Sequence, residues 1–480
     1  MKILMVFPSS QGGYGINEAT EEPPLNIAYL ASAAEKDGHR TEVLDANLLN
    51  YGPDKTADVI RRKKPDLLCL SLYAFNFRTG LEIAERTKKL LPGIITIAGG
   101  AHPSALMEKT LDKTDAIDAV AVGEGEMTLL EVAKRLDKGL EPFRDVDGVI
   151  YKNGSDIVRN KPREPITDLD TLAFPAYHLL PDISSYRRRA LKTPAAPILT
   201  SRGCPFNCIF CSRSVFGNRV RYRSAENVMS EINYLVERFG VRQLDVVDDN
   251  FITHKERAFS ILEALCRRPY RLAINLQSGV SAPLVDEKML KLMKKAGVYR
   301  IAFGVESGNG EILKAIKKKQ KLDDVTKAIR LAKKARIRSD TFFMVGLPGE
   351  TPRSMRDTID FAKKLDPHTA NFHMAVPFPG TELYDMVKKE GKLLKDTEDG
   401  IVSGYNYPDA FYEMGELKKE DVERYYKEAY RKFYFRPGKI IRTIFNIRSF
   451  AEFVWLFKTG MLVIGSLFKK KSKGRAVKNE

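Results

Sequence analysis

The chain has 480 residues, with 79 lysines and arginines against 62 aspartates and glutamates, and a formal net charge of +17. That length allows two or three domains, each with its own hydrophobic core. The charge does not indicate a nucleic-acid groove, because residues 431–480 hold thirteen basic and two acidic residues and so supply +11 of the +17.

Residues 1–140 are predicted to form a flavodoxin-like α/β domain, because apolar runs alternate with helix-like segments five times. Strands are predicted at residues 3–7, 41–44, 67–72, 94–98 and 116–122. Continuous apolar strands joined by helical crossovers indicate a doubly wound parallel sheet, whose ligands lie outside the carboxyl ends of the strands. The first residues lack the basic leader and long apolar stretch of a signal peptide, so we expect a cytoplasmic protein.

Residues 141–195 are predicted to be a connector that separates two domains. A β-hairpin is expected to turn at Asn153 and Gly154. Five prolines between residues 162 and 194 then exclude long helices.

Residues 196–400 are predicted to form a second α/β domain. Strands are expected at residues 197–201, 243–247, 272–276, 300–303, 341–345 and 371–376. Six strand-helix units indicate a partial (β/α)6 barrel of the TIM type, with functional residues at the carboxyl ends of its strands.

The first of these strands leads into a loop that carries Cys204, Cys208 and Cys211 in a C-x3-C-x2-C spacing. Three thiolates can hold a 4Fe-4S cluster through three of its irons and leave the fourth iron open to a ligand. A structural zinc site normally has four ligands, and no paired Cys/His motif follows nearby to complete one. Close spacing and an odd cysteine count disfavour disulfides, and Cys69 and Cys266 lie in apolar segments where we assign them no chemistry.

With the aromatic Phe210 before its last cysteine, this loop resembles the cluster loop of the radical S-adenosylmethionine (SAM) superfamily. The resemblance implies that the open iron binds the amino and carboxylate groups of SAM. It also implies that an external one-electron donor reduces the cluster, and that SAM is then cleaved to a 5′-deoxyadenosyl radical. SAM-binding residues are predicted in this loop and at the strand ends: Phe210, Asp248, Asp249, Gln277, Glu306 and Gly346. Taken singly, each also fits a turn or a helix cap, and His373 fits a core histidine as well as a site residue.

A flavodoxin-like domain in front of such a core resembles the cobalamin-binding class of the superfamily, as do residues 22–30 and the turns at 99–100 and 122–126. The resemblance implies cobalamin contacts at Ser71, Tyr73, Gly99, Gly100, His102, Gly123 and Glu124. No D-x-H-x-x-G motif occurs, so we expect the cobalt to lack a histidine ligand from the protein. The alternative is a domain that no longer binds the cofactor and packs on the core.

Residues 401–480 are predicted to be a helical, basic and amphipathic region. Six aromatic residues lie between positions 425 and 435, and apolar residues then lead to three lysines at 469–471. The apolar runs are shorter than the roughly 20 residues that cross a bilayer. We therefore expect residues 440–480 to contact an anionic membrane peripherally, at its inner face. The alternative is a helical cap on the barrel with a solvated lysine tail.

The resemblance predicts an enzyme that uses a 4Fe-4S cluster, SAM and cobalamin to modify an unactivated carbon. We expect methyl transfer to a small hydrophobic molecule such as an isoprenoid lipid or a tetrapyrrole. One alternative is an oxidative cyclase or rearrangement enzyme without methyl transfer. Another is RNA modification, since interleaved aromatic and basic residues can stack on bases. Enzymes of that type usually carry additional cluster cysteines in the amino-terminal domain, which here holds Cys69 alone, so we do not expect a nucleic-acid partner.

Overall fold

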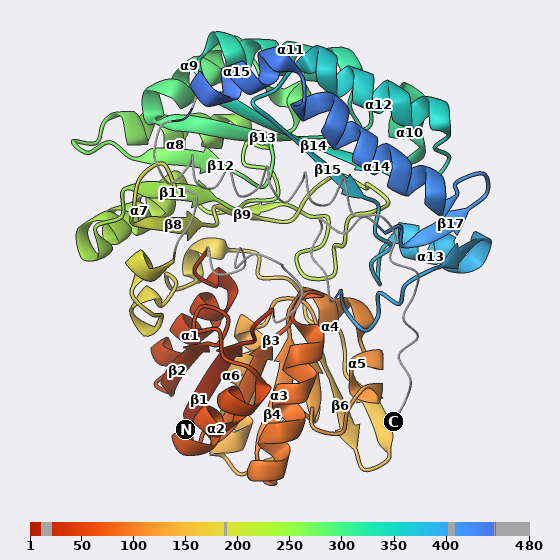
Figure 1. The fold of residues 1–480 in the computed structure, drawn as a ribbon. Coiled ribbons are helices and arrows are strands. Elements are labelled where there is room, and N and C mark those ends of the chain that lie inside the picture. The colour runs from red at the N-terminus through yellow and green to blue at the C-terminus, as the bar shows by residue number, and fades with distance from the viewer. Residues whose placement is uncertain (11–21, 187–189, 402–408, 446, 448–480) are drawn as a thin grey trace.

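Two α/β domains lie one against the other in the computed structural model, which describes residues 1–10, 22–186, 190–401, 409–445 and 447 (Figure 1). The first domain contains a seven-stranded sheet and the second a six-stranded sheet. The prediction of a flavodoxin-like domain followed by a partial barrel is confirmed.

The first sheet has the order β2-β1-β3-β4-β5-β6-β7, and its first five members in that order are parallel. Those strands are β1 (Lys2–Phe7), β2 (Arg40–Asp45), β3 (Leu67–Ser71), β4 (Ile95–Gly99) and β5 (Ala119–Ala121). The order 2-1-3-4-5 is that of flavodoxin-like folds, in which the strand order reverses beside β1 and creates a crevice at the carboxyl ends.

Helices cover both faces of this sheet, which explains why its strands are apolar throughout. In β1, Ile3 and Met5 pack beneath α1 (Leu25–Lys36) and α6 (Glu126–Asp137). Leu4 and Val6 face the opposite core, beneath α2 (Pro53–Lys63) and α3 (Phe77–Leu90). Successive side chains of a strand point to opposite faces, so a strand that is buried on both faces shows no polar alternation.

The predicted connector is in part wrong, because its hairpin belongs to the first domain. Strands β6 (Val149–Asn153) and β7 (Asp156–Arg159) pair with each other across the expected turn, and β6 pairs antiparallel with β5. The hairpin therefore widens the first sheet rather than separating two domains. Three short 3-10 turns follow it, as the prolines led us to expect: Leu169–Thr171, Tyr177–Leu179 and Ile183–Ser185.

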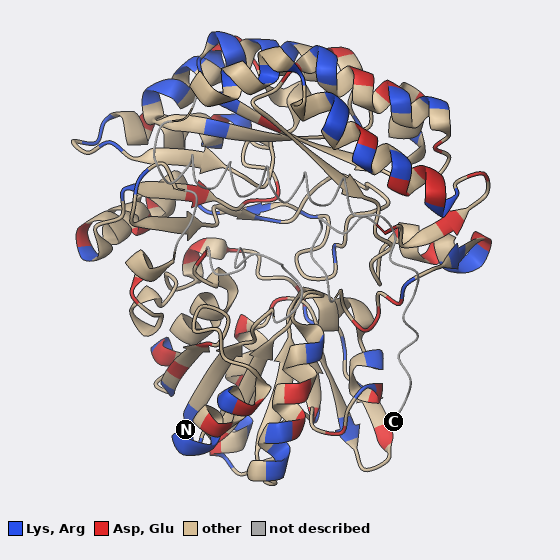
Figure 2. Ribbon diagram, in the orientation of Figure 1, with Lys and Arg blue, Asp and Glu red and all other residues tan. Residues whose placement is uncertain are grey.

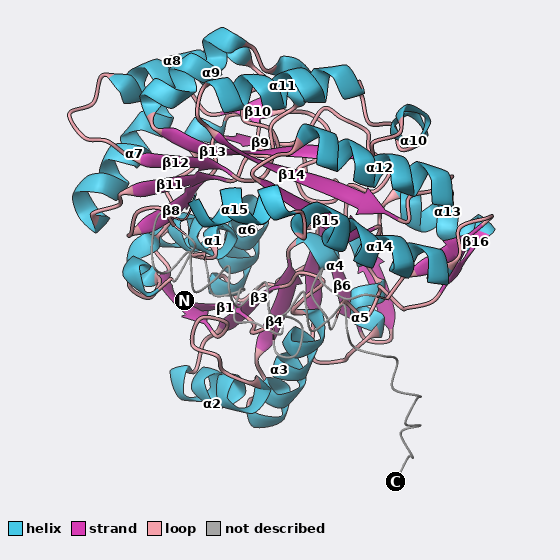
Figure 3. Ribbon diagram, turned by 45° about the horizontal axis from the view of Figure 1, so that its top comes forward, coloured by secondary structure: helices cyan, strands magenta, loops and turns pink. Residues whose placement is uncertain are grey.

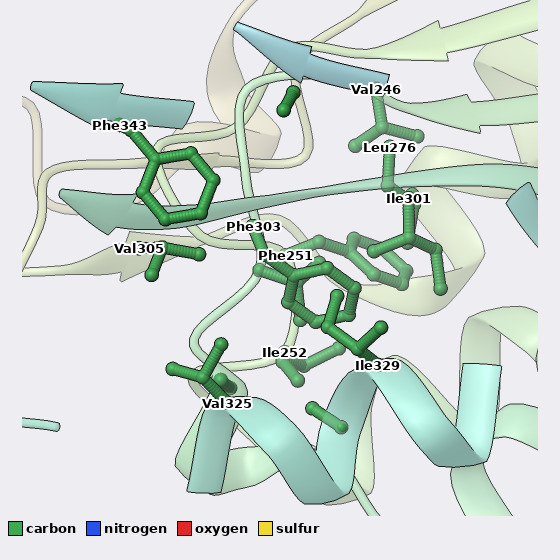
Figure 4. Close-up of a cluster of buried hydrophobic side chains, with 14 of the residues drawn as sticks. Val246, Phe251, Ile252, Leu276, Ile301, Phe303, Val305, Val325, Ile329 and Phe343 are labelled. Atoms are coloured by element: carbon green, nitrogen blue, oxygen red, sulfur yellow. The ribbon is translucent and has the colours of Figure 1, made fainter. Parts of the chain in front are cut away.

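The second sheet is wholly parallel and has the order β15-β14-β13-β12-β11-β8. Its strands are β8 (Ala195–Ile198), β11 (Gln243–Val246), β12 (Ala273–Leu276), β13 (Val298–Glu306), β14 (Arg338–Val345) and β15 (Thr369–Met374). An outer layer of helices covers it: α7 (Ala225–Phe239), α8 (Lys255–Cys266), α9 (Glu287–Ala296), α11 (Leu322–Lys334) and α12 (Pro352–Leu365) (Figure 3). Figure 4 shows how Val325 and Ile329 of α11 pack on Phe303 and Ile301 of β13.

Shorter elements lie around these layers. Two small antiparallel pairs flank the barrel, β9 (Ser201–Arg202) with β10 (Arg221–Tyr222) and β16 (Gly391–Leu393) with β17 (Tyr412–Met414). The remaining short helices are α4 (Ala101–Leu106), α5 (Lys109–Asp112), α10 (Gly310–Ala315), α13 (Glu382–Glu390) and the 3-10 turn Ala282–Leu284.

The helix α14 (Lys419–Tyr434) seals the outer edge of the barrel sheet at β15 (Figure 1). The Tyr430 hydroxyl accepts from the backbone N–H of Phe372 (3.3 Å) and donates to its carbonyl (3.0 Å). The Tyr434 hydroxyl makes the same two contacts with Ala370. An edge strand presents unpaired backbone groups that need partners. These tyrosines are thus part of the fold, as in the cap alternative, and their hydroxyls pair with the backbone of β15.

The last described helix, α15 (Pro437–Phe445), carries an exposed apolar face. The predicted membrane contact at residues 440–480 falls mostly on residues 448–480, which lie outside the described residues. Among the residues that are described, no helix is both long enough and apolar enough to cross a bilayer. Figure 2 shows basic and acidic residues mixed along the outer helices, α14 included.

Candidate active site between the two domains

A cavity of about 730 Å³ lies where the carboxyl ends of both sheets meet. One wall comes from the loops after β3, β4 and β5, and the other from the cysteine loop and the loops after β11, β12 and β13. Two ligand-binding edges, each predicted separately, therefore form a single site.

All three cysteines of the loop line this cavity. Backbone hydrogen bonds hold the loop in place, from the N–H of Ile209 to the carbonyl of Ile316 and from the N–H of Leu383 to the carbonyl of Ile209. Gly203 has a φ of +95°, and a Cβ atom there would lie 2.5 Å from the Arg219 carbonyl oxygen. The chain therefore needs glycine at this position to turn from β9 into the first cysteine.

The pKa values of the three loop thiols are shifted in different directions. The hydrogen bond from Cys211 lowers the pKa of Cys208 to about 7, and the same pairing raises the pKa of Cys211. Burial raises the pKa of Cys204. In all three thiols the Lys318 ammonium acts in the direction of a lower pKa, which favours the thiolate form that binds iron. No three side chains among the described residues are arranged around one metal ion; in a cubane cluster each thiolate binds a different iron.

Glu306 and Lys318 form a partly buried ion pair on the cavity wall. The Lys318 Nζ lies 2.9 Å from the Glu306 Oε1, and both side chains line the cavity. Glu306 ends β13 with a φ of +65°, next to an irregularity in the pairing of β13 with β14, and its carboxylate folds back over Gly304. Although burial opposes its charge, the acid and the thiols leave the pKa of Lys318 above its usual value.

The two acids after β11 have different roles. Asp248 is buried and does not line the cavity; it accepts hydrogen bonds from the Thr200 N–H (2.5 Å), the Thr200 hydroxyl (2.5 Å) and the Ser201 hydroxyl (2.6 Å). The carboxylate predicted to contact SAM thus faces the segment before the cysteine loop and holds its base. Asp249 lines the cavity, where limited contact with water raises its pKa.

Two further predicted SAM contacts do not line the cavity. The Gln277 amide donates to Glu22 (3.0 Å). Gly346 packs against Val422 of α14, and its N–H donates to Glu350 (2.7 Å). The Gln277 amide thus joins the two domains, and the Gly346 backbone is engaged within the second domain. Phe210, in contrast, lines the cavity.

Six of the seven predicted cobalamin contacts line the opposite wall: Ser71, Tyr73, Gly99, Gly100, Gly123 and Glu124. Tyr73 stacks on Phe75 with ring centroids 5.4 Å apart. A Cβ atom on Gly100, which has a φ of +104°, would lie 2.6 Å from the Leu72 carbonyl oxygen. Open backbone at these strand ends fits the close approach of a large, flat cofactor.

Two of the seven residues, His102 and Glu124, have side-chain partners in the second domain. The His102 Nε2 lies 2.9 Å from the Glu398 carbonyl oxygen, its ring meets Phe77 edge-on, and it does not line the cavity. Glu124 lines the cavity, but its carboxylate pairs with Arg202 and Arg221 of the second domain. Both side chains contact the barrel domain.

Among the cavity residues that the sequence prediction missed are Asn26, Arg202 and Lys318. Asn26 donates to the Ser71 hydroxyl. Lys318 lies in a segment with four lysines between positions 317 and 321, and nothing in the pattern distinguishes it. The sequence left two roles for His373, a core histidine or a site residue. Its ring stacks on that of the cavity residue Phe342 with centroids 5.8 Å apart, and burial lowers its pKa to about 4.

Comparison with known proteins agrees with this arrangement. The signature of the radical SAM superfamily matches residues 198–362, and that of the B12 binding domain matches residues 13–133. The chain is 32% identical over 451 residues to an uncharacterized methyltransferase of Pyrococcus horikoshii, covering 94% of this chain and 96% of the relative. It is 29% identical to the anaerobic magnesium-protoporphyrin IX monomethyl ester cyclase of Rubrivivax gelatinosus, covering 88% of this chain and 77% of that protein.

Two further likenesses bear on the fold and the chemistry. The hopanoid C-3 methylase of Methylococcus capsulatus is 28% identical and covers 80% of this chain and 72% of that protein. The cobalamin-dependent SAM radical enzyme OxsB, solved with aqua-cobalamin bound, superposes with a TM-score of 0.75 over 97% of this chain and 72% of that chain. At 18% identity, the latter is a likeness of fold.

Proposed function

Since the chain belongs to the radical SAM superfamily, in the group that carries a B12-binding domain, we propose that it transfers a methyl group to an unactivated carbon of a hydrophobic small molecule. Its cofactors are a 4Fe-4S cluster, SAM and cobalamin. When bound, the cluster with SAM supplies the radical that takes a hydrogen atom from the substrate, and cobalamin supplies the methyl group.

The observation that carries this proposal is the shared cavity. The cysteine loop and the strand ends of the first domain open into the same cavity. Methyl transfer needs the two reacting centres and the substrate carbon within reach of one another, and a cavity between the domains can hold them together.

The lining of the cavity supports a hydrophobic substrate. Apolar side chains from both domains contribute to it: Leu25, Leu30, Phe206, Phe216, Val280 and Phe342. Apolar surface favours a ligand whose own apolar surface leaves water on binding. The relative that is a hopanoid methylase acts, by its name, on such a molecule.

A second candidate function is oxidative cyclisation without methyl transfer. It is favoured by the similarity to the magnesium-protoporphyrin monomethyl ester cyclase, which covers nearly as much of this chain as the methyltransferase does. The same cavity serves both reactions, since each begins with removal of a hydrogen atom from an unactivated carbon.

Product analysis of the anaerobically reconstituted enzyme separates these two reactions. We expect SAM and a strong reductant to yield both S-adenosylhomocysteine and 5′-deoxyadenosine, and both products to disappear when Cys208 is replaced by alanine. Omission of cobalamin should abolish S-adenosylhomocysteine. Deoxyadenosine without S-adenosylhomocysteine in the complete mixture would contradict methyl transfer and favour the cyclase.

We also propose that the enzyme meets its substrate at an anionic membrane surface. On α15 the side chains of Ile440, Ile441, Ile444 and Phe445 are 45–85% exposed. These four positions lie on one side of a helix, and the sequence beyond them continues with apolar residues and the lysines at 469–471. Apolar side chains that enter the headgroup boundary, followed by basic residues, are typical of peripheral membrane binding.

Liposome flotation tests this second proposal. We expect the protein to bind vesicles with anionic lipid, and the double variant Ile441→Glu/Ile444→Glu to lose that binding. The matched control is Leu90→Glu/Leu140→Glu, which places the same two charges at comparably exposed apolar positions of the first domain. Equal binding by the wild-type protein and the α15 variant would refute membrane contact at this helix.

A further inference from the structure

Four charged side chains form a closed cluster at the boundary between the two domains. Arg202 donates to Glu124 through Nη1 and to Glu126 through Nη2, each at 2.6 Å. Arg221 Nη1 lies 2.5 Å from the other oxygen of Glu124. All four side chains are 3–6% exposed, and two positive and two negative charges balance.

The cluster connects the two halves of the active site directly. Arg202 stands two residues before Cys204, at the start of the cysteine loop. Glu124 and Glu126 follow Gly123, which lines the cavity at the end of β5. The ion pairs thus connect the backbone of the cysteine loop to the turn after β5, where cobalamin contacts are predicted.

Packing against aromatic rings also restrains the guanidinium of Arg202. The group lies between the rings of Tyr29 on α1 and Phe216, with its carbon 5.3 Å and 5.2 Å from the two ring centroids. The Glu124 carboxylate also accepts from the backbone N–H of Ile166 (2.9 Å). A planar fork held by two acids and two rings has little freedom to rotate.

Stability alone does not account for such a cluster. Removing charges from water costs about as much as their mutual attraction returns, and apolar residues of similar size often hold an interface at least as well. The hydrogen bonds between the planar guanidinium and the carboxylates are directional, so only one orientation of the two domains satisfies every one of them.

We propose that Arg202, with Glu124 and Glu126, is a positioning clamp that fixes the distance and orientation between the cluster and the cobalamin. The clamp acts on the two cofactors through the loops that hold them. The inference rests on the proposed function in one respect, that both cofactors work together in this cavity. Misplacement of reacting groups by about 1 Å can slow a reaction about 100-fold.

Magnetic resonance measures the clamp without relying on turnover. The singly reduced cluster and cob(II)alamin are both paramagnetic, and the dipolar coupling between them reports the separation of the two centres. We expect one narrow distance distribution in the wild-type protein. Arg202→Lys, which keeps the charge and loses the fork, and Glu126→Gln, which loses one ion pair, should broaden or shift it at unchanged cluster and cobalamin content.

The matched control is Arg300→Lys. Arg300 makes an arginine-carboxylate pair with Asp340 across β13 and β14, and neither residue lines the cavity. This change weakens a more exposed pair inside one domain, so it should leave the cluster-to-cobalt distance as in the wild type. The rate of S-adenosylhomocysteine formation should fall about 100-fold in Arg202→Lys and remain near wild type in the control.

Three results distinguish the explanations. An unchanged distance distribution in both clamp variants would overturn the proposal, and if Arg202→Lys does not fold, Glu126→Gln alone decides. Loss of cobalamin from a folded clamp variant with an intact cluster would also overturn it, since the changed residue would then hold the cofactor itself. A wild-type protein that retains cluster or cobalamin but not both would refute the joint use of the cofactors, and the proposed function with it.

Discussion

Replacing Lys318 with methionine tests the electrostatics of the active site. The substitution keeps an unbranched side chain of similar length and removes the cation beside Glu306 and the cysteine thiols. Two effects are expected: a loss of folding stability and a more negative reduction potential of the cluster.

The geometry of the ion pair sets the size of the first effect. At 2.9 Å, two unit charges attract by about 6 kcal/mol with an effective dielectric constant of about 20. Part of this is offset by desolvation, and breaking a buried pair by removing one partner costs about 3–5 kcal/mol. Because the Lys318 side chain is 22% exposed, we expect the low end of this range, about 3 kcal/mol.

The second effect follows from the charge of the cluster. Reduction adds an electron, so the loss of a neighbouring cation makes reduction harder and lowers the potential. Each 1.4 kcal/mol of lost attraction corresponds to about 59 mV for a one-electron couple. Anaerobic redox titration followed by the signal of the reduced cluster measures the shift.

Lys317→Met is the matched control for both measurements. Lys317 is the neighbouring residue and pairs with Glu382 at 2.5 Å, but the two side chains are 51% and 40% exposed. An exposed pair contributes about 0–1 kcal/mol, so this variant should unfold in urea near the wild-type midpoint and keep the cluster potential. Equal stability losses in the two variants, or an unchanged potential in Lys318→Met, would refute the reasoning.

Three further changes test the fold around the site. Phe433→Ala, which removes a fully buried ring of α14 from its contact with β15, should lower the free energy of unfolding by about 3–5 kcal/mol in urea titrations; a loss below 1 kcal/mol would contradict the role of α14 as part of the core. Burial raises the pKa of Glu350 to about 8, so between about pH 4.5 and 8 the folded state holds a proton that the unfolded state releases, and stability should fall as pH rises through this window. Glu350→Gln should remove that slope from thermal midpoints measured across the window, and a slope equal to the wild type would refute the assignment. Gly100→Ala should cost about 1–3 kcal/mol, because the residue has a positive φ and its new methyl group would meet the Leu72 carbonyl; wild-type stability in urea would show that the loop adapts.

The positions of the strands were accessible from sequence because strands buried on both faces leave long apolar runs. The cysteine loop was accessible because its spacing is rare and its chemistry is specific. The hairpin at Val149–Asn153 and Asp156–Arg159 was recognised, but its place in the first sheet was not. Pairing with β5 depends on contacts between segments about 30 residues apart, which local patterns do not encode.

Neighbouring residues of like character limited the site prediction. Asp248 and Asp249 are adjacent acids, and side chains that follow a strand alternate in direction. One turns into the protein to hold the cysteine loop, and the other opens into the cavity. Which acid does which depends on the exact end of β11, and strand ends are the least certain feature of a sequence prediction.

Contacts between domains explain the remaining differences. A carboxylate at a ligand-binding edge has two uses: it can face the ligand, or it can pair with a cation that the other domain supplies. Glu124 takes the second, because the fold brings Arg202 and Arg221 against the turn that carries it. A motif examined within its own domain cannot reveal this, since its partners lie 78 and 97 residues away along the chain. Where two cofactors must meet in one cavity, the residues that join their domains belong to the active site as much as those that touch the ligands. Arg202 both joins the two domains and lines the cavity.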